Sequence, residues 1–237
     1  MQGVSEIIPF TIAAGACIPL GGYIASHSHI RRRWLAQEFR HAIIALGAGI
    51  LLGAVAMVLV PEALQHLHYS IWATALLLGG GLLFYGLERY LDIHRHAAPQ
   101  FTGMLLDFIP ESLALGGLAA VGTDTTLLLA VLIGMQNLPE GFNAYQELCA
   151  AGYQRKRVLW MMLALTPLGP LFGVAGYYFL GDLPAVLGAI LLIASGGILY
   201  LIFQDIAPQV PLRKHRSPPL AAVIGFALAM LGTLFTH

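Results

Sequence analysis

The sequence predicts an all-α integral membrane protein with eight transmembrane helices, and three observations lead to this prediction. The chain of 237 residues is 58% hydrophobic and only 10% charged, whereas a soluble domain is about 45–50% apolar and about 25% charged. The apolar residues fall into runs of about 20, the length of helix that crosses a bilayer and about twice that of a barrel strand. The basic residues gather in or beside every second connection between these runs.

The eight runs follow one another closely, and their short connections are marked by Gly, Pro and charge, so we expect one transmembrane domain over residues 1–237. The N-terminus, MQGVSEIIPF, lacks the basic start of a signal peptide, and the first run is therefore expected to be retained. Only two cysteines occur, which excludes a disulfide framework. The expected helices are 5–26, 41–64, 70–91, 101–121, 125–148, 158–180, 184–206 and 218–236.

The twelve basic residues predict the orientation. They follow the first, third, fifth and seventh helices: Arg31, Arg32, Arg33, Arg40, Arg89, Arg95, Arg155, Lys156, Arg157, Arg213, Lys214 and Arg216. Basic connections stay in the cytoplasm, so this side is cytoplasmic. Because the number of helices is even, both termini lie outside, and the cell (inner) membrane is the expected location.

A proline–glutamate unit occurs twice. The fourth run contains DFIPES (107–112) and the fifth contains QNLPEG (136–141), so that Pro110 and Pro139, like the glutamates that follow them, are 29 positions apart. Each proline removes one backbone hydrogen bond and is expected to kink its helix. The prolines free the backbone carbonyls of Leu106 and Met135. These carbonyls lie next to the polar residues of the two units and could bind a ligand or water.

The turn between these two antiparallel helices lies near 122–125 (GTDT). Counting residues from that turn places Glu111 level with Gln136 and Asp107 level with Glu140. The two levels are about 6 Å apart and lie about 19–25 Å from the outer turn, at a rise of about 1.5 Å per residue. Within each helix the two polar residues stand at i and i+4 and share a face, so four oxygen-bearing side chains are expected to converge.

The energetics point to a ligand. Three ionised carboxylates at this depth would cost roughly 10 kcal/mol together, and the spans contain no Lys or Arg that could pair with them. The compensating charge must then come from protons or a metal cation. The alternative is a protonated network that only ties helices together, but that does not explain a doubled unit at matched depth.

Other polar residues suggest a pathway. Asn143 and Glu147 continue the polar face of the fifth helix towards the cytoplasm and could line an exit route, although Glu147 could equally be interfacial. Outside, His66 and His68 could capture a cation, with a solvated loop as the commoner explanation for such a pair.

The proline–glutamate units on the fourth and fifth of eight helices resemble the ZIP family of divalent metal transporters. That resemblance extends to LGAGILLGAVAMVLVPEAL (46–64), LLLGGGLLFYGLERYLD (76–92), TPLGPLFG (166–173) and ASGGILYLIFQDIAPQ (194–209). It implies a metal centre between helices 4 and 5, and a 3+2+3 arrangement in which helices 1–3 and 6–8 form inverted repeats around that hairpin. The matching main site is Asp107, Glu111, Gln136 and Glu140.

The departures from the family pattern alter the expected site. Bacterial members carry His-Asn before the first proline, where this chain has Asp107-Phe108. A second, adjacent site would need Phe108, Asn137 and Thr166, a poor ligand set, so we expect one metal. Asp205 on the seventh helix matches an acidic family position near the cytoplasmic mouth.

These features predict a transporter that moves zinc, iron or manganese into the cytoplasm, and not an enzyme. The expected partners are the divalent metal and the lipid bilayer, with no nucleic acid and no resident cofactor, and a homodimer is left open. One alternative is a degenerate relative that senses metal or acts as a scaffold. An intramembrane metallohydrolase is a weaker alternative, because the chain has no HExxH motif.

Overall fold

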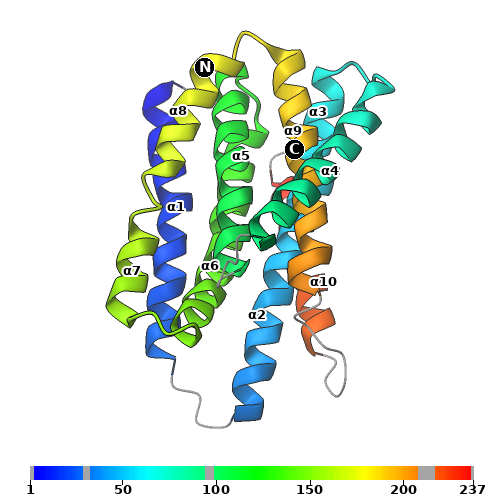
Figure 1. The fold of residues 1–237 in the computed structure, drawn as a ribbon. Coiled ribbons are helices and arrows are strands. Elements are labelled where there is room, and N and C mark those ends of the chain that lie inside the picture. Colours follow the sequence, from blue (N-terminus) through cyan, green and yellow to red (C-terminus); the bar gives the residue numbers. More distant parts are fainter. Residues whose placement is uncertain (1–2, 29–32, 94–98, 208–216, 236–237) are drawn as a thin grey trace.

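The structure is a computed structural model that describes residues 3–28, 33–93, 99–207 and 217–235. These residues form helices joined by short connections, and no strand occurs among them (Figure 1). In chain order the helices are α1 (Val4–His27), α2 (Arg33–Ala54), the π-helix η1 (Val55–Leu59), α3 (Val60–His66), α4 (Trp72–Ile93), α5 (Pro99–Val121), α6 (Thr125–Ala150), α7 (Arg155–Leu163), α8 (Leu168–Leu180), α9 (Pro184–Leu201), the π-helix η2 (Ile202–Ile206) and α10 (Ser217–Leu234).

The expected all-helical class is confirmed for the described residues, in which helix covers most of each expected range. In the part of the chain that is described, six helical segments are long and apolar enough to cross a membrane: Val4–His27, Glu38–His66, Phe101–Val121, Arg155–Leu180, Pro184–Gln204 and Ser217–Leu234. α4 and α6 are not among them. In α6 the apolar run is interrupted by the polar residues of the QNLPEG unit. The chain thus has the character of a multi-pass helical membrane protein.

The structure corrects the sequence-based helices at one place and refines them at two others. The range 158–180 is not one helix, because α7 ends at Leu163 and α8 begins at Leu168. Pro167 lies in this break and would clash with the carbonyl of Leu163, four residues earlier. Widened π turns interrupt the second and seventh helices at 55–59 and 202–206. By contrast, α5 and α6 continue through Pro110 and Pro139.

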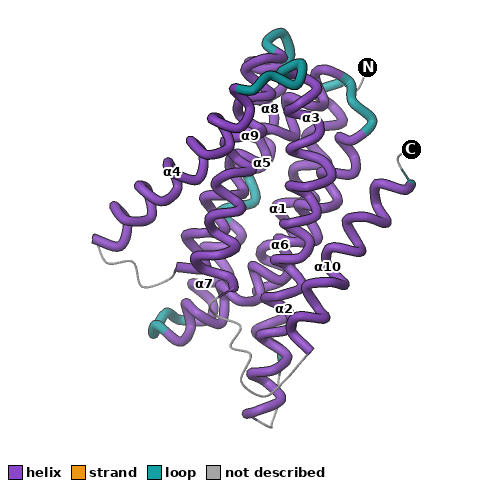
Figure 2. Tube along the Cα trace, turned by 90° about the vertical axis from the view of Figure 1, so that its right-hand side faces the viewer, coloured by secondary structure: helices purple, strands orange, loops and turns teal. Residues whose placement is uncertain are grey.

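The α5–α6 hairpin lies in the middle of the bundle. α6 packs on α1 and α2, whereas α5 packs on α8 and α9. α1 and α8 also contact each other, so α1, α5, α6 and α8 form one four-helix group. The pairs α2·α10 and α4·α9 form the other side of the molecule. Figure 2 shows α4 inclined to the other helices, and the start of α1 and the end of α10 towards the same end of the bundle.

Close backbone contacts fix these helix pairs, and they follow a pattern. A Cβ added at Gly49 would lie 2.0 Å from the Ala222 carbonyl oxygen, and one at Gly196 would lie 2.0 Å from that of Leu77. Small residues of this kind let membrane helices approach closely. Gly49 and Gly196 are 147 positions apart, as are η1 and η2, while Leu77 and Ala222 are 145 apart. The α2·α10 and α9·α4 contacts are thus equivalent.

The central helices show a similar equivalence. An added Cβ at Gly141 in α6 would lie 2.2 Å from the Ile18 carbonyl oxygen of α1, and one at Gly116 in α5 would lie 1.8 Å from the Gly173 carbonyl oxygen of α8. Gly116 and Gly141 are 25 positions apart. The α1·α6 and α8·α5 pairs are therefore packed alike.

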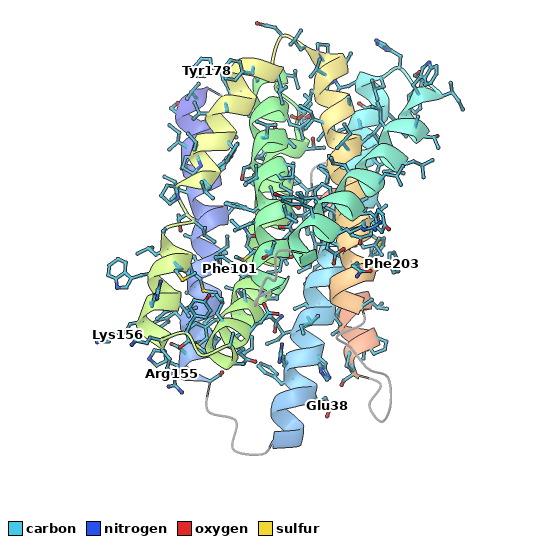
Figure 3. All side chains as sticks on the ribbon, viewed as in Figure 1. Glu38, Phe101, Arg155, Lys156, Tyr178 and Phe203 are labelled. Carbon is cyan, nitrogen blue, oxygen red and sulfur yellow. The ribbon has the colours of Figure 1, made fainter. Side chains whose placement is uncertain are left out.

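The outer faces of the helices are apolar. Large side chains that are mostly exposed include Leu78, Leu82, Phe203 and Leu220. Such a continuous apolar exterior is unusual for a soluble protein and suits lipid. Figure 3 labels three charged side chains, Glu38, Arg155 and Lys156, near one end of the bundle.

Candidate metal centre

All four residues of the expected main site are buried in the central hairpin. Asp107 and Glu111 lie on α5, and Gln136 and Glu140 lie on α6. None of the four is more than 9% exposed. The two polar pairs thus face the interior, as their i, i+4 spacing predicts.

The expected pairing across the hairpin is confirmed at one level. The amide nitrogen Nε2 of Gln136 donates to both carboxylate oxygens of Glu111, at 2.6 Å to Oε1 and 2.7 Å to Oε2. A bond to a charged acceptor is worth about 1.5–3 kcal/mol. These two bonds orient the amide and join the two central helices at mid-height.

The second level brings the remaining carboxylates near the first. Asp107 lies close enough to Glu140, and to Glu111, to interact with both electrostatically, and Glu140 interacts with Glu111 in the same way. Like charges at such distances repel unless a proton or a cation lies between them. No ion pair to any of the three is found among the described residues.

Several oxygens of this cluster have no donor. Oδ1 of Asp107, Oε1 of Gln136 and both carboxylate oxygens of Glu140 are buried without a hydrogen-bond partner in the described chain. Each buried unsatisfied polar group costs about 1–3 kcal/mol, and more when it is charged. These four oxygens are thus buried acceptors that lack a donor in the described chain, and a cation would stabilise them.

The carboxylates are not already drawn together around one point. In the ranges described, no three His, Cys, Asp or Glu side chains have an arrangement that could hold a metal ion. The main site would depend on an amide oxygen as well as carboxylates, and a cation would have to draw these side chains inward.

A bulky ring occupies the position next to the main site. Phe108 is fully buried, and its ring tip lies 3.1 Å from where a Cβ on either Gly15 or Gly169 would stand. Asn137 donates from Nδ2 to the Ala14 carbonyl oxygen at 2.9 Å. The side-chain oxygens of Asn137 and Thr166 are both buried without a partner. A second metal site here would therefore have only two neutral side-chain oxygens beside an apolar ring, which is a weak set of ligands.

The pathway residues are placed differently from one another. Asn143 is buried, and its side-chain oxygen has no hydrogen-bond partner. Glu147 is half-buried, and its Oε2 accepts a bond of 3.4 Å from the backbone N–H of Phe101 in the first turn of α5. Carboxylates stabilise helix N-termini in this way, so Glu147 has a structural role at that position. Asp205 lies in η2, but its side chain is outside the described residues.

The sequence did not reveal that α1 forms a wall of this region. Ala14 supplies the carbonyl that fixes Asn137, and Gly15 leaves room for the Phe108 ring. The only sequence signal was the run of small residues in α1.

Compared with known proteins, the chain matches no family model and no curated protein.

Proposed function

We propose that this protein carries a divalent transition-metal cation across the membrane into the cytoplasm. One observation carries the proposal: three buried carboxylates lie in the central hairpin, and among the described residues no donor reaches Oδ1 of Asp107, Oε1 of Gln136 or either carboxylate oxygen of Glu140. Intramembrane ionisable residues commonly mark ion pathways. Three carboxylates and one dication leave a net charge of −1, which a proton can neutralise.

The packing supports the inverted-repeat arrangement that the resemblance to the ZIP family implies. Equivalent contacts relate α2 to α9 by 147 positions, α4 to α10 by 145 and α5 to α6 by 25. These shifts are what one two-fold relation would produce, in which the first three helices would correspond to the last three. The same shift of 25 relates Glu111 to Gln136, which bond each other. The proposed two-fold axis then passes through that bond. Transporters of this kind bind substrate at the interface of their repeats.

The direction of transport rests on charge. Arg155, Lys156 and Arg157 follow α6 at one end of the bundle, and basic connections stay in the cytoplasm. Asp107 and Glu140 lie about one turn further from the outer turn than the Glu111–Gln136 bond. A cation leaving this level towards the cytoplasm would next meet Asn143, whose buried oxygen is also unpartnered.

Uptake of ⁶⁵Zn²⁺ or ⁵⁴Mn²⁺ into liposomes that contain the purified protein tests the proposal. Glu111→Ala and Glu140→Ala should each abolish uptake, while Glu6→Ala, an exposed residue at the start of α1, should leave it unchanged. If both of these variants take up metal at the native rate, the proposed site is wrong. Metal binding without any uptake by the native protein would instead favour a sensor or scaffold.

A further inference from the structure

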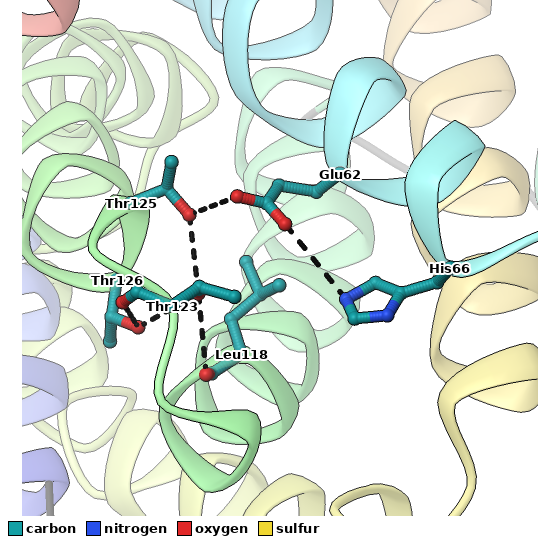
Figure 4. A network of polar contacts seen from close by, with 6 residues as sticks. All are labelled: Glu62, His66, Leu118, Thr123, Thr125 and Thr126. Atoms are coloured by element: carbon teal, nitrogen blue, oxygen red, sulfur yellow. Dashed lines mark hydrogen bonds and ion pairs between the residues drawn. The ribbon is translucent and has the colours of Figure 1, made fainter. Parts of the chain in front are cut away.

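A second group of metal-ligating side chains lies at the outer end of the bundle, away from the main site. Glu62 in α3 is 7% exposed, and its Oε1 accepts a bond of 2.5 Å from the Thr125 hydroxyl at the start of α6 (Figure 4). Thr125 in turn bonds Thr123, which also lies 3.3 Å from Thr126. Glu62 thus connects α3 to the tip of the central hairpin.

The other oxygen of Glu62 faces an imidazole. Nε2 of His66, one turn further along the same helix, lies 3.9 Å from Oε2 of Glu62. That exceeds the usual hydrogen-bond range of about 2.7–3.2 Å, and the buried Nε2 atom has no hydrogen-bond partner among the described residues. Figure 4 shows the ring and the carboxylate turned towards each other.

This separation is close to that of two ligands on one metal ion. Two bonds of about 2.05 Å at a tetrahedral metal place the ligand atoms about 3.4 Å apart. Moving Nε2 and Oε2 together by about half an ångström would therefore let both bind one ion, and both belong to flexible side chains. Neutral imidazole and carboxylate suit zinc, ferrous iron and similar ions better than magnesium or calcium.

We propose that Glu62 and His66 form an outer capture site that binds a divalent transition metal before it reaches the central carboxylates. This inference rests on the proposed function for its place in transport, but binding at the site does not require transport. Two protein ligands, completed by water, give weak binding, which suits a site that must release its ion inward. Of the two outer histidines, only His66 takes part, because His68 is exposed in a turn with a positive φ of 49°.

The hydrogen bond from Thr125 couples capture to the hairpin. The Glu62 carboxylate accepts from Thr125 through Oε1 while Oε2 faces His66. A cation on this carboxylate withdraws charge from both oxygens and weakens the Thr125 bond. Capture therefore loosens the contact between α3 and the start of α6, at the outer end of the hairpin that bears the central site.

Titration calorimetry with Zn²⁺ alone tests the site in the full chain. In the Glu111→Gln/Glu140→Gln background, whose central site is disabled, one weak Zn²⁺ site should remain. His66→Gln should weaken it by at least about tenfold, and His68→Gln should leave it unchanged. Thr125→Val, which removes only the competing hydrogen bond, should leave the site intact or tighten it. In the native background, His66→Gln should lower the stoichiometry from two ions to one.

Uptake measured on the same variants separates the two proposals. His66→Gln should raise the KM for Zn²⁺ several-fold at an unchanged maximal rate. If the native protein transports Zn²⁺ and His66→Gln changes neither binding nor KM, the capture site is wrong and the transport function stands. If no variant transports but binding still depends on His66, the capture site stands and the transport function is wrong.

Discussion

Glu140→Gln should stabilise the metal-free protein while abolishing its response to metal. Glu140 is buried, and neither of its carboxylate oxygens has a donor among the described residues. It also lies near Glu111 and Asp107, whose negative charges repel its own when all three are ionised. An ionised side chain at the centre of a membrane helix costs about 2.5–3.5 kcal/mol. The amide keeps the shape and removes the charge, so we expect a gain of about 2 kcal/mol at alkaline pH, where the carboxylate is most fully ionised.

The assay is thermal unfolding in detergent, with chelator and then with saturating Mn²⁺ or Zn²⁺. For a chain of this size a gain of about 2 kcal/mol raises Tm by about 4–8 °C. Native protein should instead gain about 2.7 kcal/mol from a metal held at about 100 times its Kd. Glu140→Gln should show the first increase and not the second.

Two matched substitutions sharpen the comparison. Glu111→Gln should not gain stability, because its new amide would meet the Nε2 donor of Gln136 that now bonds both Glu111 oxygens. Glu6→Gln removes an exposed charge and should match the native protein. The reasoning is refuted if Glu140→Gln is less stable than native in chelator, or if metal still raises its Tm.

Three further predictions test the packing, the ligand set and the protonation of the site. Gly80→Ala should destabilise the protein by about 1–3 kcal/mol, because the new Cβ would lie 2.2 Å from the Ile193 carbonyl oxygen. Gly79→Ala should not destabilise it, because the new Cβ would meet no described atom within 4 Å. Equal unfolding temperatures of the two variants would contradict the α4·α9 contact. Asp107→His should raise zinc uptake relative to manganese in a competition assay, since imidazole favours zinc; an unchanged ratio in two active proteins would remove Asp107 from the ligand set. Uptake should weaken as external pH falls from about 7.5 to about 5.5, because protons compete with metal for the carboxylates; a flat rate over that interval would contradict carboxylate ligation.

The helices could be predicted from the sequence because apolar runs of about 20 residues are separated by short connections that contain polar residues, Pro or Gly. Counting residues from the turn at 122–125 also predicted that Glu111 and Gln136 meet, since antiparallel helices joined by a tight turn leave little freedom of register. Single residues in the sequence did not predict the helix break and the π turns, because backbone geometry there depends on several residues at once. Pro167 lies at a break, whereas α5 and α6 continue through Pro110 and Pro139, so a proline alone does not predict where a helix ends. The π turn at 55–59 lies in a run that is as apolar as its neighbours.

The environment of the site could not be predicted because it is made by distant segments. The sequence shows that Phe108 stands where the family it resembles carries a ligand residue. The position of its ring against Gly15 and Gly169, however, depends on how α1 and α8 pack around α5. Likewise, the orientation of the Gln136 amide follows from its bonds to Glu111. That orientation decides that the Gln136 oxygen, and not its nitrogen, is left for a ligand.

The proposed two-fold relation would also explain why the sequence repeat is an imperfect guide to the site. The proline–glutamate units are 29 positions apart, whereas equivalent helix contacts, such as those of Gly116 and Gly141, are 25 apart. The difference is about one helical turn. Around an axis through the Glu111–Gln136 bond, Leu115 would then correspond to Glu140, and Leu132 to Asp107. Under that proposed relation the packing is nearly symmetric while the carboxylates are not, because Asp107 and Glu140 both lie on the side of the axis away from the turn between α5 and α6. In the proposed orientation, a cation that reaches Glu111 from the side of that turn would find the other two carboxylates, Asp107 and Glu140, deeper in the hairpin. The proposed site would then have a direction that its packing alone does not have.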